Sequence, residues 1–462
     1  MLLTNFKPDR AGKKPLYLQV ADCIKEQIRL GQVTPGMRLP SVRDLSAALH
    51  LSRTTTETCY SKLTAEGYLV SKPQSGYFVA DLQLPKQLPR ELPSGSTRPA
   101  ARFDFANNYV DGTTFPSVIW RRHIGQALKE KAALTGYGEP QGEPALREAL
   151  ADYSHRARGV VCAADQIVIS AGVQSLFVIL AALLQDRLFR AAPQIAWERP
   201  GFPQGEEIFR RQGWDIVHFD TEALDKVPAR LLYVSPSNPY KGRSLTPDLR
   251  RRLLRWTQER DGCILEDDYN GEFRYFTTPV SSLQGMGDGE HIVYLGSFSR
   301  LLFPSLRISY MVLPPGLLPD YRRIGRLYNQ TSSTIEQLAL ASFIREGSLR
   351  RHVKKLRRLY RRKADLLQQA LAQHCGSRVQ VRAYESGLHM RIAVDSPWDA
   401  QELARRAEAA GVRVLPVPTG QDVPSARSGN RIGAEILLSF AGISETDIDP
   451  AVARLAKAWM VP

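Results

Sequence analysis

Apolar positions in the first eighty residues fall at helical spacing and then give way to two short β-prone runs. Apolar side chains share one helical face over residues 16–30, 42–49 and 60–65, which predicts three amphipathic helices. Residues 68–70 and 77–79 flank a turn of sequence KPQSG, which predicts a two-stranded wing. Helices in this order, followed by a wing, predict a winged helix-turn-helix.

The third predicted helix begins with polar side chains of the size that reaches bases and phosphates in a major groove. Ser52 or Thr54 can cap this helix. Arg43, one turn into the second helix, is placed to contact a phosphate. Each residue alone is more often a solvated surface position, but the ordered set favours DNA binding. The candidate contacts at the start of the third helix are Arg53, Thr54, Thr55 and Thr56.

The rest of the chain alternates short apolar runs with amphipathic segments, which is the pattern of an α/β fold. Polar clusters follow four of the apolar runs, at residues 171–174, 235–242, 266–269 and 296–300. Ligands of open α/β sheets bind at the carboxyl ends of the strands. The first cluster would also place backbone N–H groups at the start of a helix, where anions bind. Any one cluster reads more simply as a loop, whereas four in order favour a ligand pocket.

Composition and charge restrict the class of protein to which this chain can belong. The 462 residues are 43% hydrophobic and 24% charged, which excludes a disordered or fibrous chain. The formal charge of +15, of which the first 80 residues contribute +5, indicates a polyanionic partner or a generally basic enzyme. The five cysteines are far apart in sequence and form no metal-ligand cluster. No apolar run approaches the ~18 residues of a membrane span and no signal peptide is recognisable, so we expect a cytoplasmic protein without a membrane partner.

Four spaced prolines mark residues 81–102 as a linker. The predicted organisation is therefore a DNA-binding domain over residues 1–80, the linker, and a larger α/β domain over residues 103–462. We see no internal repeat.

Residues 13–80 closely resemble the GntR-type winged-helix domain. The resemblance rests on the runs LPSVRDL, SRTT and SGYFV and on the Y-x-x-L-x-x-x-G spacing, with Ser46 where alanine is commoner. It implies binding to a double-stranded DNA operator, usually as a dimer, and places Gly76 at the tip of the wing. It assigns DNA contacts to Arg43, Arg53, Thr55, Thr56 and Tyr60.

The whole chain resembles the MocR/GabR-type regulators, in which a GntR-type domain is fused to a fold-type I aminotransferase-like domain that binds pyridoxal 5′-phosphate (PLP). The matching runs are YGEPQGEPALREALADY, EDDYNGEFRY and GSFSRLLFPSLRISYMVLP. This resemblance implies a homodimeric transcription regulator with a small-molecule effector. The second domain is then expected to have the α/β aminotransferase fold and to carry the dimer interface.

The same resemblance assigns roles in a PLP pocket. Asp267 would face the pyridine nitrogen, and Phe202 would stack on the ring. The ring hydroxyl would be bound by Tyr269 and Asn238. Tyr137 would reach the phosphate across the dimer interface. Within one subunit the phosphate would be held by Gly172, Val173, Ser297, Ser299 and Arg307.

One position departs from the family's pattern. The GSFS run is followed in the family by the lysine that links covalently to PLP, but here Arg300 follows it. A guanidinium stays protonated, with a pKa above about 12, and cannot replace that amine. Leu437 likewise occupies the position of a carboxylate-binding arginine. Lys241 could in principle supply the missing amine, although the sequence around it fits a loop contact better. Arg431, six residues before Leu437, would have to replace the carboxylate-binding arginine.

Three interpretations of the pocket remain open at this point. The domain holds PLP or pyridoxamine phosphate noncovalently, it binds another phosphorylated or anionic ligand, or it is a structural dimerisation unit. Because the other pocket residues persist, we predict a DNA-binding regulator that senses a small PLP-like or amine-related ligand without Schiff-base catalysis, and not an enzyme. The alternatives are a PLP-dependent aminotransferase with an appended DNA-binding domain and a catalytically inactive dimerisation domain.

The run from Arg345 to Lys363 holds ten Lys and Arg residues and one Glu. The simpler interpretation is a solvated surface helix whose apolar positions, such as Leu349 and Leu356, face the core. The alternative is an electrostatic docking surface for DNA beside the operator or for an acidic partner.

Overall fold

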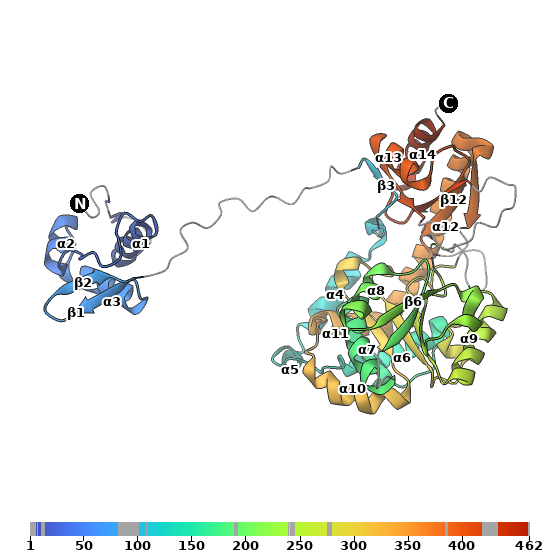
Figure 1. Cartoon of the computed structure of the whole chain (residues 1–462), viewed down its shortest axis with the longest axis horizontal. Coiled ribbons are helices and arrows are strands. Elements are labelled where there is room, and N and C mark those ends of the chain that lie inside the picture. Colours follow the sequence, from blue (N-terminus) through green and yellow to red (C-terminus); the bar gives the residue numbers. More distant parts are fainter. Residues whose placement is uncertain are drawn as a thin grey trace. The chain divides into compact units, whose positions relative to one another are not determined.

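The computed structural model describes residues 6, 8–10, 14–81, 101–107, 109–188, 193–238, 240, 245–274, 280–383, 387–417 and 433–460. The chain forms two compact units, residues 1–99 and 100–462, and each unit is described by itself (Figure 1).

Three helices and a two-stranded antiparallel wing make up the described part of the first unit. Polar side chains fix where the second and third helices begin, because they accept otherwise unsatisfied backbone N–H groups. The Ser41 side chain accepts the N–H of Asp44, and the Ser52 side chain accepts the N–H of Thr55, so Ser52 caps the third helix. The elements are α1 (Leu16–Arg29), α2 (Val42–Leu49), α3 (Arg53–Ala65), β1 (Leu69–Lys72) and β2 (Gly76–Val79).

The apolar faces of these elements meet in one core. Ile24 of α1, Leu45 of α2 and Leu63 of α3 are buried together, and the wing adds Leu69 and Val79, which pair across its two strands. The predicted winged helix-turn-helix is confirmed.

A mixed seven-stranded sheet is the centre of the second unit (Figure 1). All neighbouring strands run parallel except β10, which is antiparallel to both β4 and β9. Across the sheet the order is β4 (Ile167–Ser170), β10 (Ser309–Val312), β9 (Ile292–Ser297), β8 (Cys263–Asp267), β7 (Leu231–Val234), β5 (Gln194–Glu198) and β6 (Asp215–Phe219).

Helices cover both faces of this sheet. Successive strand residues point to opposite sides, so each apolar strand offers buried side chains to the helices on both faces. On β4, Val168 packs in the core that also contains α7, α8 and α10, whereas Ile167 and Ile169 pack in the core shared with α6 and α11. These helices are α6 (Pro144–Arg158), α7 (Val173–Leu188), α8 (Pro203–Arg211), α10 (Leu318–Ile324) and α11 (Thr334–Arg345), and the neighbouring ones are α4 (Ser117–Ala127), α5 (Lys131–Leu134) and α9 (Pro247–Arg260).

A smaller antiparallel sheet follows, in the order β11-β12-β15-β14. Its core face, with Met390, Ile392 and Leu438, packs with the helices of this region in one apolar cluster. The strands are β11 (Val379–Ala383), β12 (His389–Val394), β14 (Leu415–Pro416) and β15 (Ala434–Ser439), and the helices are α12 (Ser348–Cys375), α13 (Ala400–Ala409) and α14 (Glu445–Trp459). A short pair, β3 (Phe103–Asp104) with β13 (Val412–Arg413), runs parallel beside it. The predicted α/β fold of this unit is confirmed.

Within the part of the chain that the structure describes, no helix combines the length and the apolar character needed to cross a bilayer. The five cysteines form no disulfide.

Candidate functional sites

The first turn of α3 presents a polar surface on the first unit. Arg53 and Thr54 are exposed, and Thr55 is half-buried with its hydroxyl 2.7 Å from that of Ser52. Arg43 is exposed on the first turn of α2, directly before α3 in the helix-turn-helix. These four residues lie where the sequence predicted a DNA-reading surface, and their contacts with DNA stay a prediction.

Gly76 begins the second wing strand opposite Lys72 and has φ +101°, a conformation that favours glycine. The exposed Arg38 lies beside it, with its Nε 3.6 Å from the position of a Cβ on Gly76. The backbone of Arg38 also forms an isolated antiparallel β-bridge with that of Phe78 in the wing. This cation was not among the candidates predicted from the sequence, because only the folded wing brings it next to the turn.

Two residues predicted to contact DNA are instead buried in the core of the first unit. Thr56 is 1% exposed, and its hydroxyl accepts a hydrogen bond of 3.1 Å from Ser46. Tyr60 is fully buried and donates a hydrogen bond of 2.8 Å to the carbonyl of Pro40. The prediction that these side chains touch DNA is wrong, because the helical period places them on the same inward face as Leu63. They join α3 to the turn and to α2.

In the second unit, one edge of the sheet forms a cradle suited to an anion. Gly172 has φ +101°, and a Cβ there would lie 2.4 Å from Nη2 of Arg307. Arg307 donates a hydrogen bond of 2.9 Å to the carbonyl of Ala171, and α7 begins directly afterwards at Val173. The start of this helix therefore points backbone N–H groups at a region that a guanidinium also borders, which favours negative charge.

Serine hydroxyls line the strand ends beside this cradle. Ser309 of β10 pairs in register with Ser170 of β4 on one side and with Ser297 of β9 on the other. The hydroxyl of Ser297 accepts from Ser309 at 3.0 Å and from the backbone N–H of Ser299 at 3.3 Å. The structure thus brings Gly172, Val173, Ser297, Ser299 and Arg307 to one edge of the sheet, as the resemblance implied.

Asp267 ends strand β8 as a buried carboxylate. Burial raises its pKa to about 7, although the hydroxyl of Tyr233 donates a hydrogen bond of 2.6 Å that favours the ionised form. Tyr233 itself is stacked on Trp197, with ring centroids 4.0 Å apart. The hydrogen bond from Tyr233 therefore fixes the position of the Asp267 side chain, and a cation placed beside it would favour its ionised form.

Asn238 and Phe202 lie in the loops after β7 and β5. The Asn238 amide donates to the carbonyl of Pro200 at 2.5 Å, and its oxygen accepts the N–H of Tyr240 at 3.0 Å. Phe202 directly precedes α8 and packs against Phe177, with ring centroids 6.1 Å apart. Asn238 therefore joins these two loops, and the contact of either residue with a bound ring stays a prediction.

Arg300 is surrounded by aromatic hydroxyls and one carboxylate. Its guanidinium lies over the ring of Tyr269, 5.5 Å from the centroid. Burial lowers the pKa of Arg300, and the neighbouring Tyr269, Tyr360 and Asp267 oppose that shift. Burial and the charge of Arg300 both lower the pKa of the buried His389, so this histidine is neutral. A neutral amine is thus absent from position 300, and a fixed cation takes its place.

Leu437 has a cation directly opposite it on the neighbouring strand. Arg391 of β12 pairs in register with Leu437 of β15, so both side chains lie on the same face of the small sheet, opposite its helix-packed core. Arg391 forms an ion pair with Glu435 and donates a hydrogen bond of 2.6 Å to the carbonyl of Tyr240. Arg391 was not predicted from the sequence, because the substitutes considered there are neighbours along the chain and not across the sheet.

Three candidates remain, and the structure describes only one of them. Tyr137 is 91% exposed, and among the described residues no hydrogen bond or ring contact links it to the pocket. Lys241 and Arg431 lie outside the residues that the structure describes.

Each of the two units matches a known protein family. Residues 16–79 match the family described as "Bacterial regulatory proteins, gntR family", and residues 104–455 match "Aminotransferase class I and II". The chain is 36% identical to the uncharacterized HTH-type transcriptional regulator YdeL of Bacillus subtilis, over 97% of each chain. It is 29% identical to the probable rhizopine catabolism regulatory protein MocR of Rhizobium meliloti, over 98% of this chain and 95% of that one.

Solved structures show the same fold for the second unit. A kynurenine aminotransferase of Pyrococcus horikoshii matches with a TM-score of 0.67 and 21% identity, over 77% of this chain and 90% of that one. An archaeal alanine:glyoxylate aminotransferase matches with a TM-score of 0.68 and 17% identity, over 95% and 99%. The fold and the sequence together define a DNA-binding regulator with an aminotransferase-type domain. The chain belongs to the MocR-type regulators of the gntR family.

Proposed function

We propose that the second unit of this regulator senses a phosphorylated ligand of the PLP class, which it binds noncovalently, and that it does not act as an aminotransferase. The observation that carries the proposal is the anion cradle of Gly172 and Arg307 in the same unit as an arginine at position 300. The cradle supports phosphate binding, and the arginine removes the amine that covalent chemistry requires.

The cradle fits a phosphate in charge and in space. Arg307 supplies a cation, the start of α7 supplies backbone N–H groups, and Ser297 and Ser299 supply hydroxyls. Any side chain at position 172 would have its Cβ 2.4 Å from Arg307 Nη2, so the guanidinium would have to shift, and the φ of +101° also favours glycine there. Phosphate, with three acceptor oxygens, matches such a set of donors.

The residues near Asp267 fit a ring that carries a protonated nitrogen. Burial holds the pKa of this carboxylate at about 7, and a cation beside it would return the carboxylate to its ionised form. When bound to an enzyme, PLP supplies an electron sink for chemistry at an amine carbon. In this chain the groups around position 300 only bind and orient, because Arg300 offers a fixed charge in place of a proton-accepting amine.

Regulation then requires that the ligand favour one arrangement of the regulator over another. A ligand shifts such an equilibrium only by its different affinity for the two arrangements. We further propose that the regulator acts in the cytoplasm as a homodimer on a double-stranded operator, with the exposed Tyr137 completing the partner subunit's pocket. The chain's relatives at 29% and 36% identity are named as regulators, which supports this assignment over a role in metabolism.

The direct test is calorimetric titration of the full chain with PLP, pyridoxamine phosphate, pyridoxal and inorganic phosphate. We expect the two phosphorylated vitamers to bind and pyridoxal to bind about 100-fold more weakly, because it lacks the charge-assisted contacts. Gly172→Ala should remove that preference, and Gly213→Ala is the matched control, since Gly213 also has positive φ but no atom within 4 Å of its Cβ position. Equal binding of PLP and pyridoxal would contradict the proposed phosphate site.

Gel shifts on an operator-bearing fragment then test the regulatory part. We expect the operator affinity to change severalfold when PLP or pyridoxamine phosphate is added. An operator affinity that ignores both vitamers would leave the second unit as a dimerisation domain and would contradict ligand sensing.

A further inference from the structure

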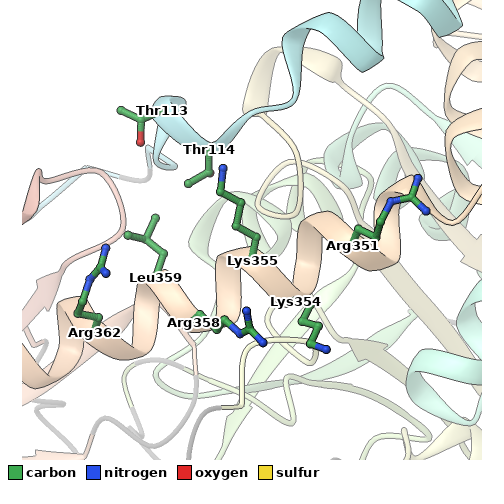
Figure 2. A pocket seen from close by; sticks show the side chains of 8 residues that line it. All are labelled: Thr113, Thr114, Arg351, Lys354, Lys355, Arg358, Leu359 and Arg362. Atoms are coloured by element: carbon green, nitrogen blue, oxygen red, sulfur yellow. The ribbon is translucent and has the colours of Figure 1, made fainter.

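Helix α12 borders a groove of about 520 Å³ on the second unit. One wall is the helix itself, and the other includes Thr113 and Thr114 of the short turn η1 (Gly112–Thr114). Figure 2 shows Lys355 extending from α12 toward Thr114, with Arg351 and Arg362 near the two ends of the row of side chains. The cations that line the groove are Arg351, Lys354, Lys355, Arg358 and Arg362.

The basic run of the sequence divides into two sets in the structure. The first set stabilises the fold. Lys363 is buried, forms an ion pair of 2.6 Å with Asp111 and donates to the carbonyls of Ala441 and Ile443. Arg345 pairs with Glu148. The apolar face of α12, with Leu349, Leu356 and Tyr360, is buried in the core, so the simpler sequence interpretation holds for this set.

The groove set is different, because its cations point to solvent. Lys354, Lys355 and Arg358 are exposed, and no ion pair joins them to a carboxylate among the residues that the structure describes. Only Arg362, at the end of the row, pairs with Glu445 at 2.6 Å. Like charges gathered on one face repel each other, which favours a bound anion.

We propose that this groove binds the phosphate backbone of DNA outside the operator contacted by the first unit. From Arg351 to Arg362 the helix rises about 16 Å, at ~1.5 Å per residue. Each strand of double-stranded DNA carries one phosphate per ~3.4 Å of the helix axis, so the row of cations spans about five phosphates of one strand. An extended row of flexible side chains matches a repeating polyanion better than one small anion.

The chemistry of the same chain selects DNA over an acidic protein. Its first unit is a DNA-binding domain, and covalent linkage raises the effective concentration of DNA at every basic surface of the second unit. The proposal is independent of any ligand in the aminotransferase-type pocket, so its failure would leave the proposed function intact.

The test compares two DNA fragments with the same operator, one cut at the operator's edges and one with long flanks, in gel shifts over a salt series. We expect the full chain to bind the long fragment more tightly. The variant K354Q/K355Q/R358Q should lose about tenfold affinity for the long fragment and none for the short one. Its salt slope on the long fragment should fall by about 2 to 3, because each phosphate contact contributes ~0.9.

The matched control removes three exposed cations elsewhere on the same unit, with Arg156→Gln, Arg251→Gln and Arg255→Gln. This control should keep both the affinity and the salt slope. An equal loss for the groove variant and the control would show a nonspecific charge effect and overturn the proposal, as would no loss at all. A groove variant with an altered mass by light scattering would assign the groove to contact between copies of the chain, which also overturns it.

Discussion

The two ends of the candidate ligand site in the second unit differ in kind. At one end, Gly172 and Arg307 with the start of α7 keep every element of an anion cradle. At the other end, Arg300 lies over the ring of Tyr269, at the position where the family resemblance predicts a PLP-linked lysine. Binding needs only fixed donors and charge, whereas covalent catalysis needs a neutral amine. On the function proposed above, the second unit therefore binds a PLP-like ligand with the cradle but lacks the amine that covalent chemistry requires.

Comparisons of fold and of whole-chain sequence give different information about this protein. Aminotransferases with TM-scores of 0.67 and 0.68 share the fold of the second unit at 21% and 17% identity. The relatives that match the whole chain, at higher identity, are named as transcriptional regulators. Fold alone does not decide function, because the residues at the site do.

The largest effect on PLP affinity is expected from removing Arg307, the cation of the cradle. We expect Arg307→Gln to weaken PLP binding about 100-fold, because it removes charge-assisted hydrogen bonds that contribute about 2–3 kcal/mol. Pyridoxal, which lacks the phosphate, should bind as it does to the unchanged chain. Titration calorimetry with both ligands measures this, and Arg326→Gln, an exposed arginine in the short helix η7 (Gly325–Leu327), is the control. Equal losses for PLP and pyridoxal would mean that Arg307 supports the loop and not the phosphate.

A smaller effect is expected at the ring. Asp267→Asn keeps the size of the side chain but cannot ionise, so we expect PLP affinity to fall about tenfold. Ser235→Ala, in the next loop, removes a different buried hydrogen bond to the Asp267 backbone and should leave the affinity within about threefold. Unchanged affinity in Asp267→Asn would exclude an ionic contact between this carboxylate and the ring.

The same carboxyl predicts a pH dependence of stability. Because burial raises the pKa of Asp267 to about 7, the folded state binds a proton that the unfolded state has already lost above about pH 4. The free energy of unfolding should therefore fall as the pH rises from about 4 to 7, by at most about 1.4 kcal/mol per pH unit from this group. Thermal unfolding of the wild type and of Asp267→Asn isolates this contribution, since Glu266 and Glu272 shift in the same direction in both. Parallel pH profiles would contradict it.

The smallest effect concerns Arg391. We expect Arg391→Gln to lower the affinity for carboxylate-bearing amino acids, measured with saturating PLP, by about three- to fivefold. The loss is modest because Glu435 already pairs with this guanidinium. Arg382→Gln, exposed on the adjacent strand, should change nothing. Identical affinities in both variants would show that no ligand carboxylate uses this face of the sheet.

Much of this architecture could be predicted from the chain. The winged helix-turn-helix followed from periodicity, because Leu45 and Leu63 recur on inward helical faces. The polar clusters at the strand ends followed from the order of buried runs, and the structure places Gly172, Ser297 and Arg307 at one edge of the sheet.

The sequence predictions that were wrong or incomplete have physical causes. The same periodicity that predicted α3 also places Thr56 and Tyr60 inward. The polar run at the start of the helix suggested a DNA contact for Thr56, and the family resemblance assigned one to Tyr60. Arg391 and Arg38 depend on register and on the wing turn, which bring together residues that are distant in the chain. The division of the basic run into a buried Lys363 and an open groove likewise depends on which face of α12 packs against the core.

We expect position 300 to separate PLP binding from covalent chemistry, and reductive trapping tests this directly. The full chain and Arg300→Lys are incubated with PLP, treated with borohydride and analysed by peptide mass spectrometry. We expect the wild type to bind PLP but to carry no pyridoxyl group on any lysine, while Arg300→Lys gains that group at position 300. A pyridoxyl-lysine in the wild type would contradict the account.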